Sequence, residues 1–149
     1  MKVDSTVLEL GCGPGYFSPF IAKSIPKGKL YLADIQPQML EKARKRLEKK
    51  KITNVEFKLC DGNSLPFADM MFDVAYLVTV LGEVANTDLY VRELFRVLKS
   101  GGILSVSEQA GDPDSIPLQE LETLLLPAGF VSDTIFGKNR TYTANFRKP

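Results

Sequence analysis

VLELGCGPGYFS, residues 7–18, is a short apolar run that ends in closely spaced glycines and leads into a helical pattern. Gly11, Gly13 and Gly15 let the backbone turn sharply and approach a ligand without a Cβ in the way. The helix expected just beyond them offers backbone N–H groups that have no partner within the helix. This order of strand, glycine loop and helix predicts a small-molecule site.

The composition of the chain suits one globular domain spanning residues 1–149. Apolar residues make up 44% and charged residues 25%, which allows a well-packed core. The 19 basic and 18 acidic residues leave a formal net charge of +1. The overall charge therefore favours neither a nucleic acid nor an acidic partner, and binding has to be inferred from local sites.

The cysteine content and the N-terminus narrow the class of protein. Cys12 and Cys60 are the only cysteines, and the chain has no histidine. An ordinary structural zinc site needs four nitrogen or sulfur ligands, so we expect no metal centre and a packing role for both thiols. The sequence has no leader pattern, and no apolar run approaches the roughly 18 residues of a membrane span. We expect a cytoplasmic protein with reduced thiols.

Alternating periodicities divide the chain into strands and helices. Runs of β-forming residues predict strands at 6–10, 30–33, 55–59, 72–78 and 103–106. Apolar residues at helical spacing predict helices at 17–25, 37–47, 90–98 and 117–128. Gly101 and Gly102 are expected to end the third helix. The last strands, 130–136 and 140–146, flank a Gly-Lys-Asn turn and predict an antiparallel hairpin.

This order of elements predicts a Rossmann-like, doubly wound α/β fold. Strands that alternate with helices form a mostly parallel sheet that is covered on both faces and joined by right-handed crossovers. Seven strands are expected, of which the last two form the C-terminal antiparallel hairpin. Ligands bind such sheets outside the carboxyl ends of the strands, where the strand order reverses. We expect the glycine loop at that place.

The glycine spacing argues against a phosphate ligand. A dinucleotide fingerprint reads G-x-G-x-x-G, but Tyr16 stands where its third glycine would be. No Lys-Ser or Lys-Thr pair follows the glycines, which excludes a triphosphate-binding loop. A tight turn without a ligand is the alternative, although three glycines in five residues exceed what a turn needs.

Five blocks of the sequence together resemble the class I S-adenosylmethionine-dependent methyltransferases. They follow in that family's order between residues 7 and 108: LELGCGPGYFS, LADIQPQML, CDGNSLPF, FDVAYLVTVLGEV and LFRVLKSGGILSVSE. The resemblance is greatest to the ubiquinone/menaquinone C-methyltransferase-like (methyltransferase type 11) branch. It implies S-adenosylmethionine as cofactor and S-adenosylhomocysteine as product. The cofactor contacts that it implies are Glu9, Gly11, Gly13, Tyr16, Asp34, Ile35, Met39, Asp61, Gly62, Asn63 and Val78.

The resemblance assigns the ribose hydroxyls to Asp34 and the adenine amino group to Asp61. The chemistry of Asp34 agrees, because a carboxylate at a strand end can accept two hydroxyl hydrogen bonds at once. N-capping of the helix that begins near Pro37 is its alternative role. Ile35 and Met39 offer apolar surface to one side of an adenine ring, or belong to the core.

Aromatic and basic residues near the glycine loop each have two interpretations. Tyr16 presents an aromatic face that attracts a cationic sulfonium, or it packs against a helix. Leu65 and Phe67 close the second side of an adenine ring, or pack in the core. The basic residues between Lys42 and Lys51 have no interleaved aromatics, which favours a solvated helix face over a nucleic-acid site.

Methyl transfer from a sulfonium is an in-line displacement, so we expect the protein to act on a small-molecule acceptor mainly by proximity and alignment. A dedicated catalytic residue is not required. Where the acceptor must lose a proton, Glu83 and Glu108 are the candidate bases, with structural or solvent-facing roles as alternatives. Close relatives usually have histidine where Gly82 and Glu83 stand, and the resemblance does not name the acceptor.

The first predicted strand begins within a few residues of Met1, whereas members of this family usually have helices there that cover the cofactor. We therefore expect an open site. A large acceptor, a second copy or a partner chain that covers the site, and truncation of the chain are alternative explanations. The alternative functions are a non-catalytic cofactor-binding or partner subunit and a nucleotide-dependent oxidoreductase of the same architecture.

Overall fold

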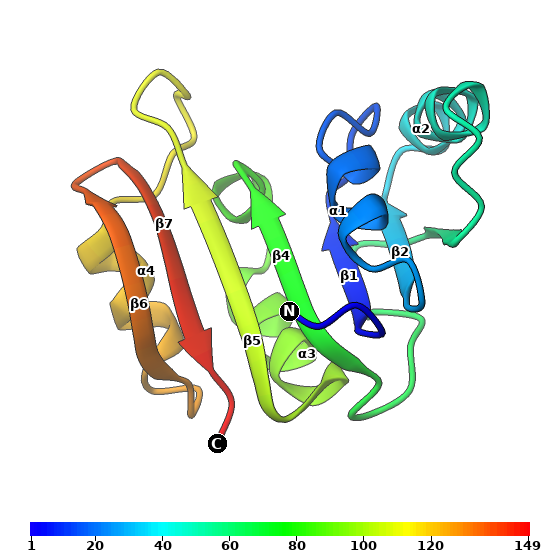
Figure 1. Ribbon diagram of the computed structural model, residues 1–149. Helices are drawn as coiled ribbons and strands as arrows, with labels where there is room; N and C mark the ends of the chain where they lie inside the picture. Colours follow the sequence, from blue (N-terminus) through cyan, green and yellow to red (C-terminus); the bar gives the residue numbers. More distant parts are fainter.

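One seven-stranded sheet runs through the computed structural model, which describes residues 1–149. Its strands are β1 (Thr6–Leu10), β2 (Lys29–Asp34), β3 (Val55–Leu59), β4 (Phe72–Val78), β5 (Leu98–Glu108), β6 (Val131–Lys138) and β7 (Thr141–Arg147). They lie in the order β3-β2-β1-β4-β5-β7-β6 (Figure 1). β1 to β5 pair in parallel, and β7 pairs antiparallel with both β5 and β6. The predicted doubly wound sheet with a C-terminal hairpin is confirmed.

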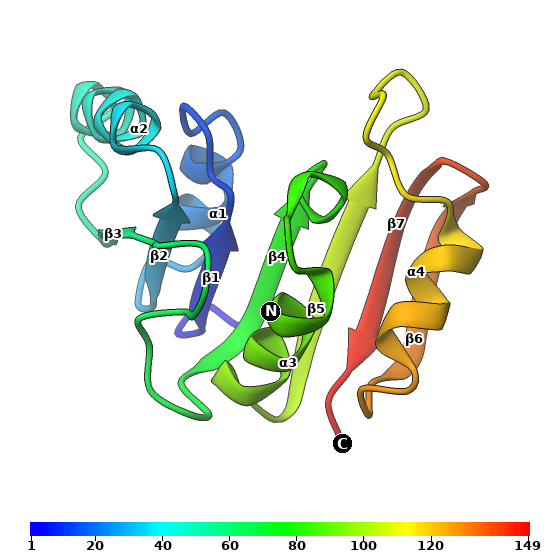
Figure 2. The same cartoon turned by 180° about the vertical axis from the view of Figure 1, so that it is seen from behind.

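Helices cover both faces of this sheet. They are α1 (Ser18–Ser24), α2 (Pro37–Lys49), α3 (Thr87–Val97) and α4 (Leu118–Leu125), with a short 3-10 helix, η1 (Leu81–Glu83), after β4. α1 and α2 lie on one face and α3 and α4 on the other, as the front and back views show (Figures 1 and 2). Prolines begin α1 and α2, because the ring fixes a helical φ where no N–H partner is needed. No helix has the length and apolar character needed to cross a bilayer.

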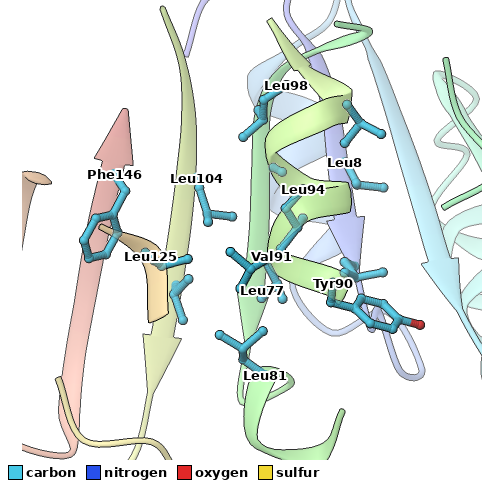
Figure 3. Packing of buried hydrophobic residues seen from close by; sticks show 14 of the residues in the cluster. Leu8, Leu77, Leu81, Tyr90, Val91, Leu94, Leu98, Leu104, Leu125 and Phe146 are labelled. Atoms are coloured by element: carbon cyan, nitrogen blue, oxygen red, sulfur yellow. The ribbon is translucent and has the colours of Figure 1, made fainter. Parts of the chain in front are cut away.

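Each face of the sheet has its own hydrophobic core. The smaller core packs α1 and α2 on β1 and β2, and includes Ala22, Leu32 and Leu47. The larger core packs α3 and α4 on β4, β5 and β7, with Leu94, Leu104 and other fully buried residues at its centre (Figure 3). Burial of each such leucine contributes about 1.5–3 kcal/mol to folding. These cores hold the carboxyl ends of the central strands in place.

The predicted end of the third helix is wrong. α3 ends at Val97, and β5 begins at once with Leu98 and runs through both Gly101 and Gly102. Gly101 has a φ of 77°, and the β4–β5 register shifts between Phe72 and Val74. The glycines therefore allow an irregularity within the strand, rather than a stop after the helix.

The segment between β3 and β4 contains no helix and is anchored by Arg96 of α3. The Arg96 guanidinium donates hydrogen bonds to the carbonyls of Phe67 and Leu65 at 2.8 and 3.0 Å, and it pairs with Glu93 and Asp69. Glu93 also accepts the N–H of Leu65 at 2.7 Å. These bonds replace the backbone hydrogen bonds that a crossover helix would supply. Leu65 and Phe67 are thereby buried in the larger core.

Candidate active site

A cavity of about 450 Å³ opens at the carboxyl ends of the central strands. It is lined by the glycine loop after β1, the first residues after β2, the segment after β4 and η1. β1 and β4 are the strands between which the order reverses. The cavity thus lies where ligands bind open α/β sheets, as the sequence predicts.

The glycine loop has a backbone that other residues adopt only at a cost. Gly11 has a φ of 70°, and a Cβ on it would lie 2.5 Å from Cγ2 of Val80. Gly13 has a φ of 53°, and a Cβ there would meet nothing within 4 Å. Gly11 and Cys12 donate their N–H groups to the Ala33 carbonyl, which fastens the loop to β2. The loop is therefore close-packed at Gly11 and open at Gly13, which lines the cavity.

The carboxylate of Asp34 joins this loop to the turn after β2. Its Oδ2 accepts the N–H of Gly13 at 3.0 Å, and its Oδ1 accepts the N–H of Gln36 at 2.9 Å. The N-cap of α2 is Gln36, so Asp34 does not have the helix-capping role considered as its alternative. Asp34 is buried and lines the cavity. A carboxylate has about four acceptor positions, so it keeps capacity for ligand hydroxyls.

Glu9 is a buried acid at the base of the cavity. Its Oε2 accepts the Ser18 hydroxyl of α1 at 2.5 Å. Burial raises the pKa of Glu9 to about 7, against the opposing effect of this hydrogen bond. The Tyr76 hydroxyl is also buried beside Glu9 and opposes the rise in the Glu9 pKa, and both residues line the cavity. A carboxyl and a hydroxyl side by side in a cavity wall offer hydrogen-bonding groups to a ligand.

α2 supports the loop through one of its basic residues. The Arg46 guanidinium lies 4.5 Å from the centre of the Tyr16 ring, and its Nε donates to the Pro14 carbonyl at 3.0 Å. Arg44 lies over Phe57 at 4.4 Å in the same way. Arg46 is the half-buried member of a basic run that is otherwise exposed, as expected of a solvated helix face. Tyr16 packs on α2, which is one of its two predicted roles, and it also lines the cavity.

The two candidate bases occupy different positions. Glu83 in η1 lines the cavity, and burial followed by the charges of Asp112, Asp114 and Asp34 raises its pKa. Glu108 ends β5 and is only 2% exposed, but it is not among the residues that line the cavity. Burial raises the pKa of Glu108 to about 7. Glu83 is therefore placed to meet a ligand directly, and Glu108 is not.

The cavity brings together nearly all the residues for which we predicted cofactor contacts. Asp61 and Asn63 are the exceptions, since neither lines it. The Asp61 carboxylate instead accepts the N–H groups of Asn63 and Ser64 at 2.8 and 3.2 Å. It stabilises its own turn in this structure, and Cys60 and Gly62 are the residues of that block that line the cavity.

Several lining residues have no specific signal in the sequence. Tyr90 follows the apolar spacing of a helix and reads as core, yet its hydroxyl points out of the core cluster and the residue lines the cavity (Figure 3). Cys12 and Cys60 are buried free thiols, as expected, but they also belong to the cavity wall. Burial raises the pKa of both, to about 11 for Cys60, which keeps them protonated. Phe17 and Val80 are likewise cavity residues.

The charge of the cavity restricts what it can bind. Its wall has three carboxylic acids, Glu9, Asp34 and Glu83, and no lysine or arginine. Aromatic rings from Tyr16, Phe17, Tyr76 and Tyr90 complete it. Carboxylates and aromatic faces attract cations and repel a pyrophosphate. These residues fit a nucleoside that carries a sulfonium, which is the cofactor that the sequence resemblance implies.

Comparisons with known proteins agree with this geometry. The family model described as a methyltransferase domain matches residues 1–132. The ubiquinone/menaquinone biosynthesis C-methyltransferase UbiE of Pseudomonas fluorescens is 36% identical over 110 residues, which are 72% of this chain and 43% of that protein. The chain spans 37–43% of the length of the first curated relatives that it matches.

Solved structures share the fold at low identity. A SAM-dependent methyltransferase from Aquifex aeolicus has a TM-score of 0.89 and 23% identity, and the match covers 99% of this chain and 84% of that one. A methyltransferase solved in complex with the Haloferax volcanii Trm112 methyltransferase activator has a TM-score of 0.82 and 17% identity. The match covers 100% of this chain and 84% of that one. By its family model, its curated relatives and its fold, the chain belongs to the methyltransferase domain family, among the class I S-adenosylmethionine-dependent, UbiE-like methyltransferases.

Proposed function

We propose that this chain transfers a methyl group from S-adenosylmethionine to a small-molecule acceptor. The observation that carries the proposal is a cavity with three carboxylic acids, four aromatic rings and no basic side chain beside a glycine loop. A cationic cofactor without phosphate suits this wall, whereas a dinucleotide would bring a pyrophosphate next to Glu9 and Asp34. S-adenosylmethionine supplies, when bound, a methyl carbon that its sulfonium already activates.

Each part of the wall has a role in holding the cofactor. Asp34 accepts the ribose hydroxyls with the acceptor positions that Gly13 and Gln36 leave unused. The open backbone at Gly13 lies along the methionine portion. Ile35 and Met39 contribute apolar surface for the adenine. Because these residues fix the cofactor at several points, the chain acts mainly by aligning the methyl group with its acceptor.

A second chain is proposed as the cover of the cavity. Tyr16 and Phe17 line it and are 62% and 50% exposed, so large apolar rings stand at its opening. Exposed apolar surface of this kind is typical of a contact site. Light scattering of the protein with and without S-adenosylhomocysteine tests this proposal. A monomer that methylates a small acceptor unaided would overturn it.

Calorimetry and radiolabel transfer together test the main proposal. We expect S-adenosylmethionine and S-adenosylhomocysteine to bind with one site per chain, and labelled methyl to pass into a small-molecule fraction of a cell extract. NAD serves as the control ligand. Preference for NAD would favour an oxidoreductase, and cofactor binding without transfer to any fraction would favour a non-catalytic subunit.

A further inference from the structure

An acidic rim borders the cavity on the side of β4 and β5. We define it as Glu83 of η1, Glu108 at the end of β5, and Asp112 and Asp114 of the following loop. η1, this loop and the glycine loop all lie at one edge of the sheet (Figure 1). The two segments that form the rim are in direct contact, because a Cβ on Gly82 would lie 1.7 Å from the Asp114 carbonyl oxygen.

No basic side chain neutralises the rim. None of its four acids takes part in an ion pair of the structure. Arg140 donates to the carbonyl and hydroxyl oxygens of Ser115 in the same loop, and not to a carboxylate. The Asp112 side chain accepts only the N–H of Asp114, at 2.9 Å. The rim therefore keeps its negative potential, since internal hydrogen bonds do not cancel charge.

Glu108 gives a second and independent indication of a ligand. It is 2% exposed, and its Oε1 is buried without a hydrogen-bond partner. Burial raises its pKa, a hydrogen bond from the Ile116 backbone opposes this rise, and the nearby charges of Asp112 and Glu83 add to it. A buried carboxyl oxygen without a partner is unfavourable unless it is protonated or meets a positive group. A cation held in the rim would relieve that cost.

We infer that the methyl acceptor is a small amine, whose ammonium cation Glu83 contacts at the cavity while the other rim carboxylates attract it through their charge. This inference rests on the proposed methyl transfer and adds the chemical class of its acceptor. Glu83 is the rim residue that also lines the cavity, so it can contact both the ammonium and the space where the methyl group is held. Gly82 leaves no room for a side chain, because the Asp114 carbonyl fills the space.

The transfer requires that the ammonium first lose a proton, since it has no lone pair. Glu83 accepts this proton, and the raised pKa of its carboxyl favours the uptake. The nitrogen lone pair then forms the N–C bond to the methyl carbon as the C–S bond breaks, and that bond's electron pair stays on sulfur. The product is a methylated ammonium ion, and Glu83 returns its proton to water.

Binding to the protein loaded with S-adenosylhomocysteine tests the acceptor class without requiring turnover. Benzylamine and benzyl alcohol are the probes, because they match in shape and differ in charge. We expect benzylamine to bind at least about tenfold more tightly, as a charge-assisted hydrogen bond predicts. With the protein saturated with S-adenosylhomocysteine, Glu83→Gln should remove that preference, whereas Glu48→Gln on the exposed face of α2 should leave it unchanged.

The outcomes separate the inference from the proposed function. Equal binding of the two probes, no detectable binding of either, or an amine preference that survives in Glu83→Gln would overturn the inference. Loss of S-adenosylhomocysteine binding in Glu83→Gln would also overturn it, because Glu83 would then serve the cofactor. Failure of the unsubstituted protein to bind S-adenosylhomocysteine would instead contradict the proposed methyl transfer. The double variant Asp112→Asn/Asp114→Asn should reduce the preference for benzylamine in part. An unchanged preference would mean that these two carboxylates have no role in binding the amine.

Discussion

Asp34 at the end of β2 accepts the N–H of Gly13 at 3.0 Å, across 21 positions of the sequence. The same carboxylate accepts the N–H of Gln36 on its other oxygen. One acid therefore holds the glycine loop and the start of α2 in a fixed relation before any ligand binds. Preorganisation of this kind reduces the conformational cost of binding.

Removal of this carboxylate should weaken cofactor binding strongly. Asp34→Ala loses the bond to Gly13 together with the proposed charge-assisted bonds to ribose, so we expect a loss of about 1.5–3 kcal/mol in binding free energy. Calorimetric titration with S-adenosylhomocysteine measures it, and Asp4→Ala at an exposed turn is the control. Unchanged affinity in Asp34→Ala would reject the ribose role.

Close packing at Gly11 should make it sensitive to a single methyl group. Gly11→Ala places a Cβ against Val80 and forces a φ of 70° on a residue that avoids it, so we expect a loss of about 1–3 kcal/mol in stability. Val80→Ala in the same chain should restore the part that comes from the clash. Thermal unfolding measures both, with Gly111→Ala as the control because a Cβ there meets nothing within 4 Å. A fully stable Gly11→Ala would contradict the described loop.

Arg46 should support the site although it does not line the cavity. Arg46→Ala removes the hydrogen bond to Pro14 and the stacking on Tyr16, so the glycine loop should loosen and lose cofactor affinity by a few fold, or about 1 kcal/mol. Amide exchange of residues 13–16 and calorimetry provide the measurements. Lys45→Ala, at a side chain that is 73% exposed on the same helix, should have no effect on either. Equal effects of the two changes would indicate a general charge effect instead.

Stability should fall as the pH rises from about 4.5 to about 7. Glu9 and Glu108 have folded-state pKa values of about 7, against 4.5 in the unfolded chain, so the folded state binds more protons in this window. The stabilisation that these two carboxyls give the folded state is complete below pH 4.5 and is lost as the pH rises through 7. Carboxyls with lowered pKa, such as Asp73 and Glu93, act below this window.

Denaturant titrations across this range check the effect. Glu9→Gln should flatten the fall in unfolding free energy, and Glu9→Gln/Glu108→Gln should flatten it further, whereas Glu48→Gln should leave it unchanged. A slope that does not depend on either residue would mean that other groups control stability in this window.

The sequence by itself determined the order of the elements and the place of the site. Strand 6–10, the three following glycines and Asp34 at the end of the next strand each depend on local patterns, namely a buried apolar run, positive φ angles and a strand terminus. Because parallel strands present their carboxyl ends at one edge of the sheet, those patterns also predict where the cavity lies. The sequence therefore predicts where the proposed cofactor side of the site lies.

Only the tertiary structure decided which polar groups are used within the fold and which remain free for a ligand. Asp61 has the position expected of an adenine contact, yet backbone N–H groups within its own turn satisfy its carboxylate. Gly101 lies within β5 because β4 pairs with β5 both before and after the register shift at this glycine. The acidic rim forms where the loop after β5 meets η1, a contact between segments about 30 residues apart. Such contacts depend on long-range packing, which short-range sequence patterns do not encode, so the proposed acceptor side of the site forms only in the folded chain.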